Sequence, residues 1–177
     1  MDLQKIADGV RLILEGIGED VTREGLDKTP ARVAEMCREI FGGMENQPQI
    51  EAEISEEIDT EVILLKDIPF YSMCEHHLLP FFGKVHLAYA PKGNRVAGFS
   101  ALTRLIDVFA RRLQVQERMT SQIADAVMEQ LDPLGVLVIV EAQQLCISMR
   151  GSKKDSTRTV TKAVRGDISV KNMFPFD

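Results

Sequence analysis

Two cysteines and one histidine of this chain have the side chains and the spacing that a zinc site requires. Cys74 and His77 form a Cys-x-x-His step, and Cys146 lies far along the chain. Such a step lets a thiolate and an imidazole reach one metal from a single turn, and a distant cysteine completes a Cys₂His set that suits zinc. Three protein ligands leave a fourth position for water, which is typical of a catalytic zinc because the bound water loses a proton near neutral pH.

The spacing alone also supports an interpretation without metal. Free cysteines are among the most buried residue types, so Cys74 and Cys146 could be small core side chains, with His77 in ordinary hydrogen bonds. Core packing is the better interpretation for Cys37, on the apolar face of an expected helix, and a structural role is the better one for His86, within an expected strand. Three cysteines in a chain of this size do not suggest a disulfide framework.

The composition predicts a soluble globular protein with a single domain over residues 1–177. The chain is 45% hydrophobic, with no run of about 18 apolar residues that could span a membrane. Charged residues interrupt the first helical pattern, so we expect no secretory leader and a cytoplasmic location. The net charge of −6 argues against a general nucleic-acid surface. Any phosphate-binding site must therefore be a local basic cluster.

Hydrophobic periodicity predicts an α+β protein with an antiparallel sheet. Residues 1–43 have apolar side chains at three- and four-residue steps with glycines behind them, which indicates a helical hairpin. Residues 44–60 are acidic and poor in large apolar side chains, so we expect a solvated connector. Residues 61–166 form the expected core.

Within this core we expect strands and helices in alternation. A strand over 62–65 precedes a hairpin made of 84–90 and 95–99. Two helices follow, the first with Ser100 as its N-cap. A second hairpin then joins the apolar run that starts at 135 to the alternating stretch 157–164.

The segment from Tyr71 to His86, YSMCEHHLLPFFGKVH, resembles the signature of the GTP cyclohydrolase I family. Further matches follow in order: GFS at 98–100, RRLQVQER at 111–118, Cys146 with MRG at 149–151, and TVT at 159–161 with RG at 165–166. The resemblance runs from about residue 3 to residue 166. It favours the metal interpretation of the cysteines over the core-packing one.

This resemblance implies the tunnelling fold. In that fold an N-terminal helical hairpin precedes an antiparallel four-stranded sheet backed by two helices, and sheets from several subunits close into a barrel. The resemblance also implies a homo-decamer of two pentamers, with active sites between subunits.

The resemblance further implies a substrate, GTP, and a reaction. Zinc-bound water attacks C8 of the guanine, a second hydrolysis releases formate, and the ribose rearranges to give 7,8-dihydroneopterin triphosphate for folate-type cofactors. The family's zinc ligands correspond to Cys74, His77 and Cys146, and His76 is the natural proton shuttle. The implied substrate contacts are Gln116 and Glu117 for guanine, and Arg32, Ser100, Arg104 and Arg150 for phosphate.

Two positions of the implied site depart from the family pattern. Gln144 stands where the family has a histidine, and a glutamine cannot exchange a proton near pH 7. Ala101 stands where the family has a phosphate-contacting lysine. The tail, residues 167–177, is also unlike the helix that usually closes the family chain. These departures suggest a paralogue that stops at the ring-opened formamide or acts on another guanine compound.

A non-catalytic zinc-containing oligomer that binds a purine or pterin is the alternative of another class. The presence of His76 and Glu117 argues against it, because a structural zinc would not need them.

Overall fold

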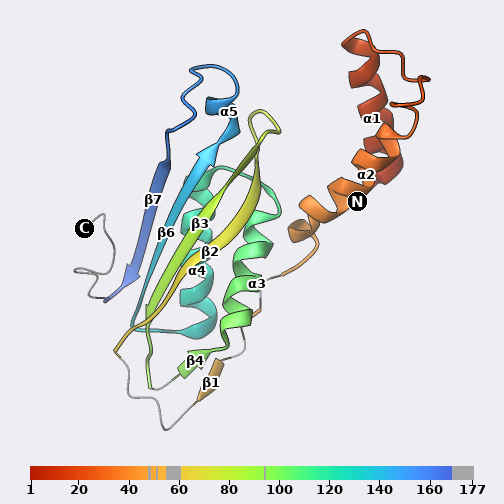
Figure 1. The fold of residues 1–177 in the computed structure, drawn as a ribbon. Helices are drawn as coiled ribbons and strands as arrows, with labels where there is room; N and C mark the ends of the chain where they lie inside the picture. The colour runs from red at the N-terminus through yellow and green to blue at the C-terminus, as the bar shows by residue number, and fades with distance from the viewer. Residues whose placement is uncertain (48, 51, 55–60, 94, 169–177) are drawn as a thin grey trace. The chain divides into compact units, whose positions relative to one another are not determined.

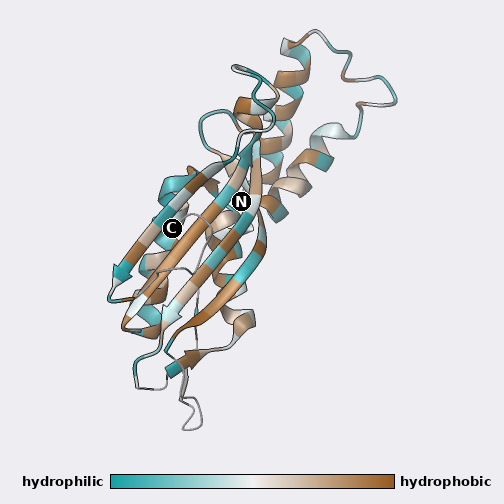
Figure 2. Ribbon diagram, turned by 60° about the vertical axis from the view of Figure 1, so that its left-hand side comes forward, coloured by the Kyte–Doolittle hydropathy of each residue, from teal (hydrophilic) through white to brown (hydrophobic). Residues whose placement is uncertain are grey.

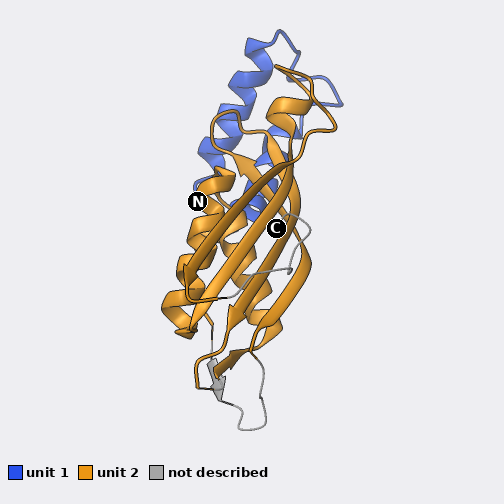
Figure 3. Ribbon diagram, turned by 90° about the vertical axis from the view of Figure 1, so that its left-hand side faces the viewer, with its two compact units in different colours: residues 1–42 blue, residues 43–177 orange. Residues whose placement is uncertain are grey.

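The computed structural model describes residues 1–47, 49–50, 52–54, 61–93 and 95–168. The chain divides into two compact units, residues 1–42 and residues 43–177 (Figure 3). Most of the atypical tail predicted over 167–177 lies outside the described residues. Among the residues that are described, no helix is both long and apolar enough to cross a membrane.

The first unit is the expected helical hairpin. Helix α1 (Leu3–Gly16) begins where the Asp2 side chain accepts a hydrogen bond from the Lys5 N–H, which satisfies a free amide of the first turn. Helix α2 (Thr29–Ile40) has Pro30 in its first turn, where a missing N–H costs nothing. The two helices pack against each other.

The second unit is built on a five-stranded sheet with the order β5-β2-β3-β6-β7. Its long strands are antiparallel neighbours: β2 (Ile63–Cys74), β3 (Pro80–Ala90), β6 (Gly135–Gln144) and β7 (Thr159–Gly166). The two-residue strand β5 (Leu113–Gln114) lies parallel to the end of β2. The expected four strands are thus extended by one short strand at the β2 edge.

Helices α3 (Phe99–Ala110) and α4 (Gln116–Leu131) cover one face of this sheet (Figure 1). Period-two alternation turns Val85, Leu87 and Tyr89 of β3 into this interface, and each is fully buried. Hydrophobic segments run along the central strands (Figure 2). The α+β prediction, with two helices backing an antiparallel sheet, is confirmed.

The predicted hairpin between 84–90 and 95–99 is wrong. Strand β3 pairs with β2, whereas β4 (Arg95–Ala97) pairs with β1 (Ala52–Ile54). The expected connector therefore contains a strand. Strand β2 also runs well past the predicted residue 65. The prediction stopped there because an irregularity between Leu65 and Ile68 breaks the alternation of side chains that indicates a strand.

Asp67 lies at this irregularity with a left-handed φ of 58°. Its N–H donates to Nδ1 of His86 at 3.1 Å, which gives His86 the structural role that its position predicts. Burial lowers the pKa of His86, which favours the neutral ring that can accept this bond.

Ser100 is not the N-cap of the first core helix. That position is Gly98, and Ser100 is the second helical residue of α3. A serine in the first turn is a weak guide to the exact cap, because the backbone of a glycine can occupy the cap position without a side-chain bond.

Gly83 allows the close approach of β3 to β6. A Cβ at this position would overlap the backbone carbonyl of Glu141 and crowd the Cα of Ala142. Backbone cannot move aside without disturbing the ladder, so we expect Gly83→Ala to lower the free energy of unfolding by about 3 kcal/mol. Urea denaturation of the purified chain measures this.

Gly9→Ala is the matched control, because Gly9 is in helix α1 with nothing within 4 Å of an added Cβ. We expect this variant to be as stable as the wild type or about 1 kcal/mol more stable. Wild-type stability of Gly83→Ala would contradict the packing argument.

Candidate metal centre

The tight turn between β2 and β3 positions the first two donors. Cys74 ends β2, and the chain returns at Pro80. The Cys74 N–H donates to the Leu79 carbonyl and the Leu78 N–H donates to the Cys74 carbonyl, both at 2.9 Å. Leu78 adopts a left-handed φ of 52° to close the turn. Cys74 and His77 are thereby held on one small loop.

The third donor comes from the neighbouring strand. Cys146 lies in the short helix α5 (Leu145–Ser148), which directly follows β6. The turn over residues 74–79, which carries Cys74 and His77, is named the metal turn. Strand β6 pairs with β3 in a register that sets Gln144 opposite Phe81, close to the end of this turn. Strand pairing therefore brings the distant cysteine next to the Cys-x-x-His step.

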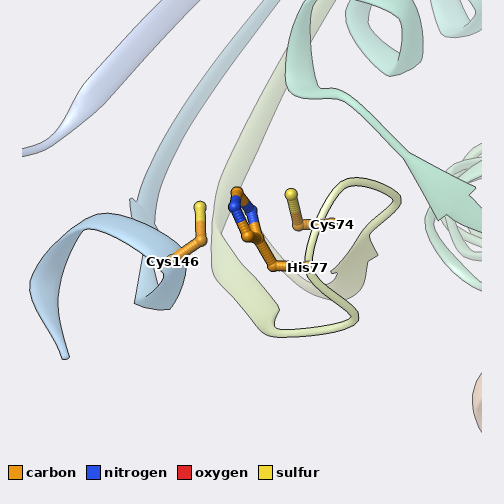
Figure 4. Close-up of side chains that lie close together, drawn as sticks. All are labelled: Cys74, His77 and Cys146. Atoms are coloured by element: carbon orange, nitrogen blue, oxygen red, sulfur yellow. The ribbon is translucent and has the colours of Figure 1, made fainter. Parts of the chain in front are cut away.

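The three side chains form one cluster. Each offers one ligand atom, and these atoms all lie within 4.8 Å of one another. In Figure 4 the His77 ring lies between the two cysteine side chains. Tetrahedral zinc with bonds of about 2.0–2.3 Å needs its ligands roughly 3.5–3.8 Å apart, so the donors fit the ion with little movement. Cys74 is buried and His77 is exposed, so solvent can reach the cluster.

The closeness of the two thiols also favours binding of a cation. Burial raises the pKa of the Cys146 thiol, and the neighbouring Cys74 raises it further, because two thiolates side by side repel each other. A divalent cation held by Cys74 and Cys146 would reverse this balance and favour the deprotonated form of both sulfurs.

Gln144 takes part in a partly buried hydrogen-bond network. Its Nε2 donates to Oε1 of Gln116 at 2.8 Å. The Nε2 of Gln116 in turn faces the carbonyls of Val140 and Thr159, each at 2.9 Å, and the Thr161 hydroxyl at 3.1 Å. Carbonyls only accept hydrogen bonds, so the orientation of the Gln116 amide is determined. Gln144 must then present its side-chain NH₂ to Gln116, so its side-chain carbonyl oxygen points away from Gln116.

The remaining predicted residues occupy several elements. His76 is exposed on the metal turn, and Glu117 is exposed beside the buried Gln116 at the start of α4. Ser100 and Arg104 are exposed on α3, and Arg150 is exposed just after α5, whereas Arg32 belongs to α2 of the first unit. Ala101 is buried. The substrate-binding roles assigned to these residues stay predictions.

Sequence reasoning missed an ion pair that connects the metal turn to α4. Glu75, between the candidate ligand Cys74 and His76, pairs with Arg118 of α4. Both residues stand inside motifs that carry the family resemblance, but neither motif indicates that the two side chains meet.

Comparison with known structures supports the fold. The structure described as "archaeosine synthase QueF-Like in the apo form" matches with a TM-score of 0.50 and 18% sequence identity, covering 63% of this chain and all of that one. At this identity the likeness concerns the fold alone. The second unit thus has the tunnelling fold, and it carries a cluster of two thiols and an imidazole that could hold a metal ion.

Comparison with known sequences identifies the family. The family model described as GTP cyclohydrolase I matches residues 6–174. "GTP cyclohydrolase 1" of Carboxydothermus hydrogenoformans is 55% identical over 168 residues, covering 94% of this chain and 87% of that protein. The protein of the same name from Clostridioides difficile is also 55% identical, with 94% and 88% covered. The chain belongs to the GTP cyclohydrolase I family and is a hydrolase of that type.

The cluster predicts that metal binding depends on two of the three cysteines. We expect the purified chain to bind one Zn²⁺ per chain, and Cys146→Ser to weaken binding by at least about 100-fold, since an alcohol is a far poorer zinc ligand than a thiolate. Competition with a chromophoric chelator measures the affinity.

Cys37→Ala is the control, because Cys37 is a buried thiol on α2, in the other unit. It should bind Zn²⁺ as the wild type does. Equal affinity of Cys146→Ser and the wild type would remove Cys146 from the site.

Proposed function

We propose that this chain hydrolyses the guanine imidazole ring of GTP at C8, giving formate and 7,8-dihydroneopterin triphosphate. The observation that carries the proposal is the convergence of Cys74, His77 and Cys146, which come from two distant segments. Family membership supplies the reaction type. Zinc bound by these donors would activate water for attack on C8.

Other side chains of the protein supply the remaining functions. His76 is exposed on the same turn, and its imidazole can move a proton near neutral pH. Glu117 presents a carboxylate that can accept hydrogen bonds from the donor edge of guanine. Arg104 and Arg150 offer positive charge for the triphosphate, with Ser100 as a further donor.

We further propose that the chain works as a homo-decamer of two pentamers. The tunnelling fold closes its barrel from several sheets, and two surfaces support such an assembly. Strand β7 forms one edge of the described sheet and exposes Val160 and Val164. Helix α1 exposes Leu12 and Ile13. Apolar surface of this kind is typical of subunit interfaces.

A second candidate is a reaction that stops at the ring-opened formamide. It is favoured by the network around Gln144, whose amide group is engaged by Gln116 and which has no titratable proton. The buried Ala101 also leaves α3 without the family lysine, which favours a substrate with fewer phosphates. This candidate predicts a product heavier than its substrate by one water, without formate.

Incubation of the Zn²⁺-loaded oligomer with GTP separates the candidates. Pterin fluorescence together with formate supports the full reaction, and the hydrated product without formate supports the shorter one. GTP binding without any product would contradict both and support a binding function. The same assay with GDP and GMP tests the phosphate requirement.

Gln144→His tests whether this position limits the chemistry. A positioned acid or base contributes roughly 10²–10⁴-fold, so we expect pterin formation to rise by about 100-fold. Formate release and fluorescence measure the rate.

Gln143→His is the matched control. Gln143 is the neighbouring residue of β6, points to the opposite face of the sheet and donates to the Asp155 carbonyl. It should leave the rate unchanged. An unchanged rate in Gln144→His would show that Gln144 does not limit the reaction.

A further inference from the structure

Arg118 is anchored on three sides at the start of α4. Its Nε donates to Oε1 of Gln114 at 2.9 Å, and its Nη2 donates to the Leu113 carbonyl at 3.1 Å. The same Nη2 contacts the carboxylate of Glu75 on the metal turn. Two of the three acceptors belong to β5, so hydrogen bonds to β5 orient the guanidinium independently of Glu75.

Gln114 gives this anchor a rigid base. Its side chain is 1% exposed, and its Nε2 donates to the Phe109 carbonyl at 3.0 Å and to Oε1 of Gln122 at 2.9 Å. These donations direct its Oε1 toward Arg118, because a carboxamide has its donors and its acceptor on opposite atoms. The guanidinium is therefore oriented from the interior of the unit.

Glu75 connects this anchor to the metal ligands. Its N–H donates to the Gln114 carbonyl at 3.0 Å, and its carboxylate pairs with Arg118. Glu75 thus docks on β5 by its backbone and on the first turn of α4 by its side chain. Glu75 directly follows Cys74 and precedes His77 by two residues, so whatever holds Glu75 also holds both donors of the turn.

Global stability does not explain this arrangement. The Arg118 and Glu75 side chains are 42% and 32% exposed, and exposed ion pairs contribute little to folding. The turn, by contrast, has few internal restraints, with two backbone hydrogen bonds and a left-handed residue at Leu78. The docking of Glu75 on β5 and α4 therefore supplies a restraint that the turn itself does not have.

We propose that Arg118 is a positioning residue for the metal centre, acting through Glu75 to hold Cys74 and His77 on one ion. The inference rests on the proposed metal site and adds a residue outside the ligand set. Groups that orient metal ligands from behind typically change metal affinity about 10- to 100-fold when they are removed. The interaction also links the start of α4, which carries Gln116 and Glu117, to the metal turn.

Zn²⁺ affinity without any nucleotide tests the proposal. We expect Arg118→Ala and Glu75→Gln each to weaken Zn²⁺ binding about 10-fold or more in chelator competition. The double variant should bind Zn²⁺ no more weakly than whichever single variant has the lower affinity, because both substitutions remove the same interaction. In the metal-free protein, the amides of residues 74–79 should exchange with deuterium faster in both single variants.

Asp125→Asn is the matched control. It removes another exposed arginine–carboxylate pair of α4, the contact between Asp125 and Arg165 of β7. It should leave both Zn²⁺ affinity and the exchange of the turn at wild-type values. Should Arg118→Ala fail to fold, Glu75→Gln alone decides, since it removes one charge from a partly exposed side chain.

Affinity within about twofold of the wild type in Glu75→Gln, a change well below what orienting groups give, would overturn the proposal. Additive losses in the double variant would overturn it as well. A wild-type chain that binds no Zn²⁺ overturns this inference and the proposed zinc chemistry together. A chain that binds Zn²⁺ but does not turn over GTP leaves only the catalytic proposal contradicted.

Discussion

The pairing of β3 with both of its neighbours is the constraint on which the candidate metal centre depends. Pairing with β2 closes the turn that carries Cys74 and His77, and pairing with β6 brings Cys146 beside that turn. A shift of one residue in either ladder would move the donors to the other face of the sheet. Gly83 belongs to this constraint, because only a residue without a side chain fits against the backbone of β6.

Two buried glutamine side chains orient neighbouring polar groups by hydrogen bonds. Gln116 is oriented by carbonyls of β6 and β7, and Gln114 by the Phe109 carbonyl and by Gln122. Each in turn orients a second residue by accepting its hydrogen bond: Gln116 accepts from Gln144, and Gln114 accepts from Arg118. Low local dielectric strengthens such networks, and a group left unpaired within them would be costly. The hydrogen bond of Gln144 to Gln116 therefore explains how the fold accommodates a glutamine at this position.

Much of the fold could be predicted from local pattern. The helical hairpin, the α+β class and the pairing of β6 with β7 follow from hydrophobic periodicity and turn residues. The predicted pairing of β3 with β4 failed because sequence proximity favours a hairpin, whereas β3 pairs along its length with the long strands β2 and β6. The full length of β2 was missed because Asp67 interrupts the alternation at the irregularity.

The sequence by itself determined the types of the metal donors, the Cys-x-x-His spacing and the family to which the chain belongs. These are properties of residue identity and order, which short segments carry without reference to the rest of the chain. The tertiary structure alone decided that Cys146 meets the turn, that the Gln144 amide faces Gln116, and that Arg118 reaches Glu75. Each of these contacts joins residues far apart in sequence, so each depends on strand register and helix placement. Register and placement are determined by the packing free energy of the whole core, which no single motif encodes.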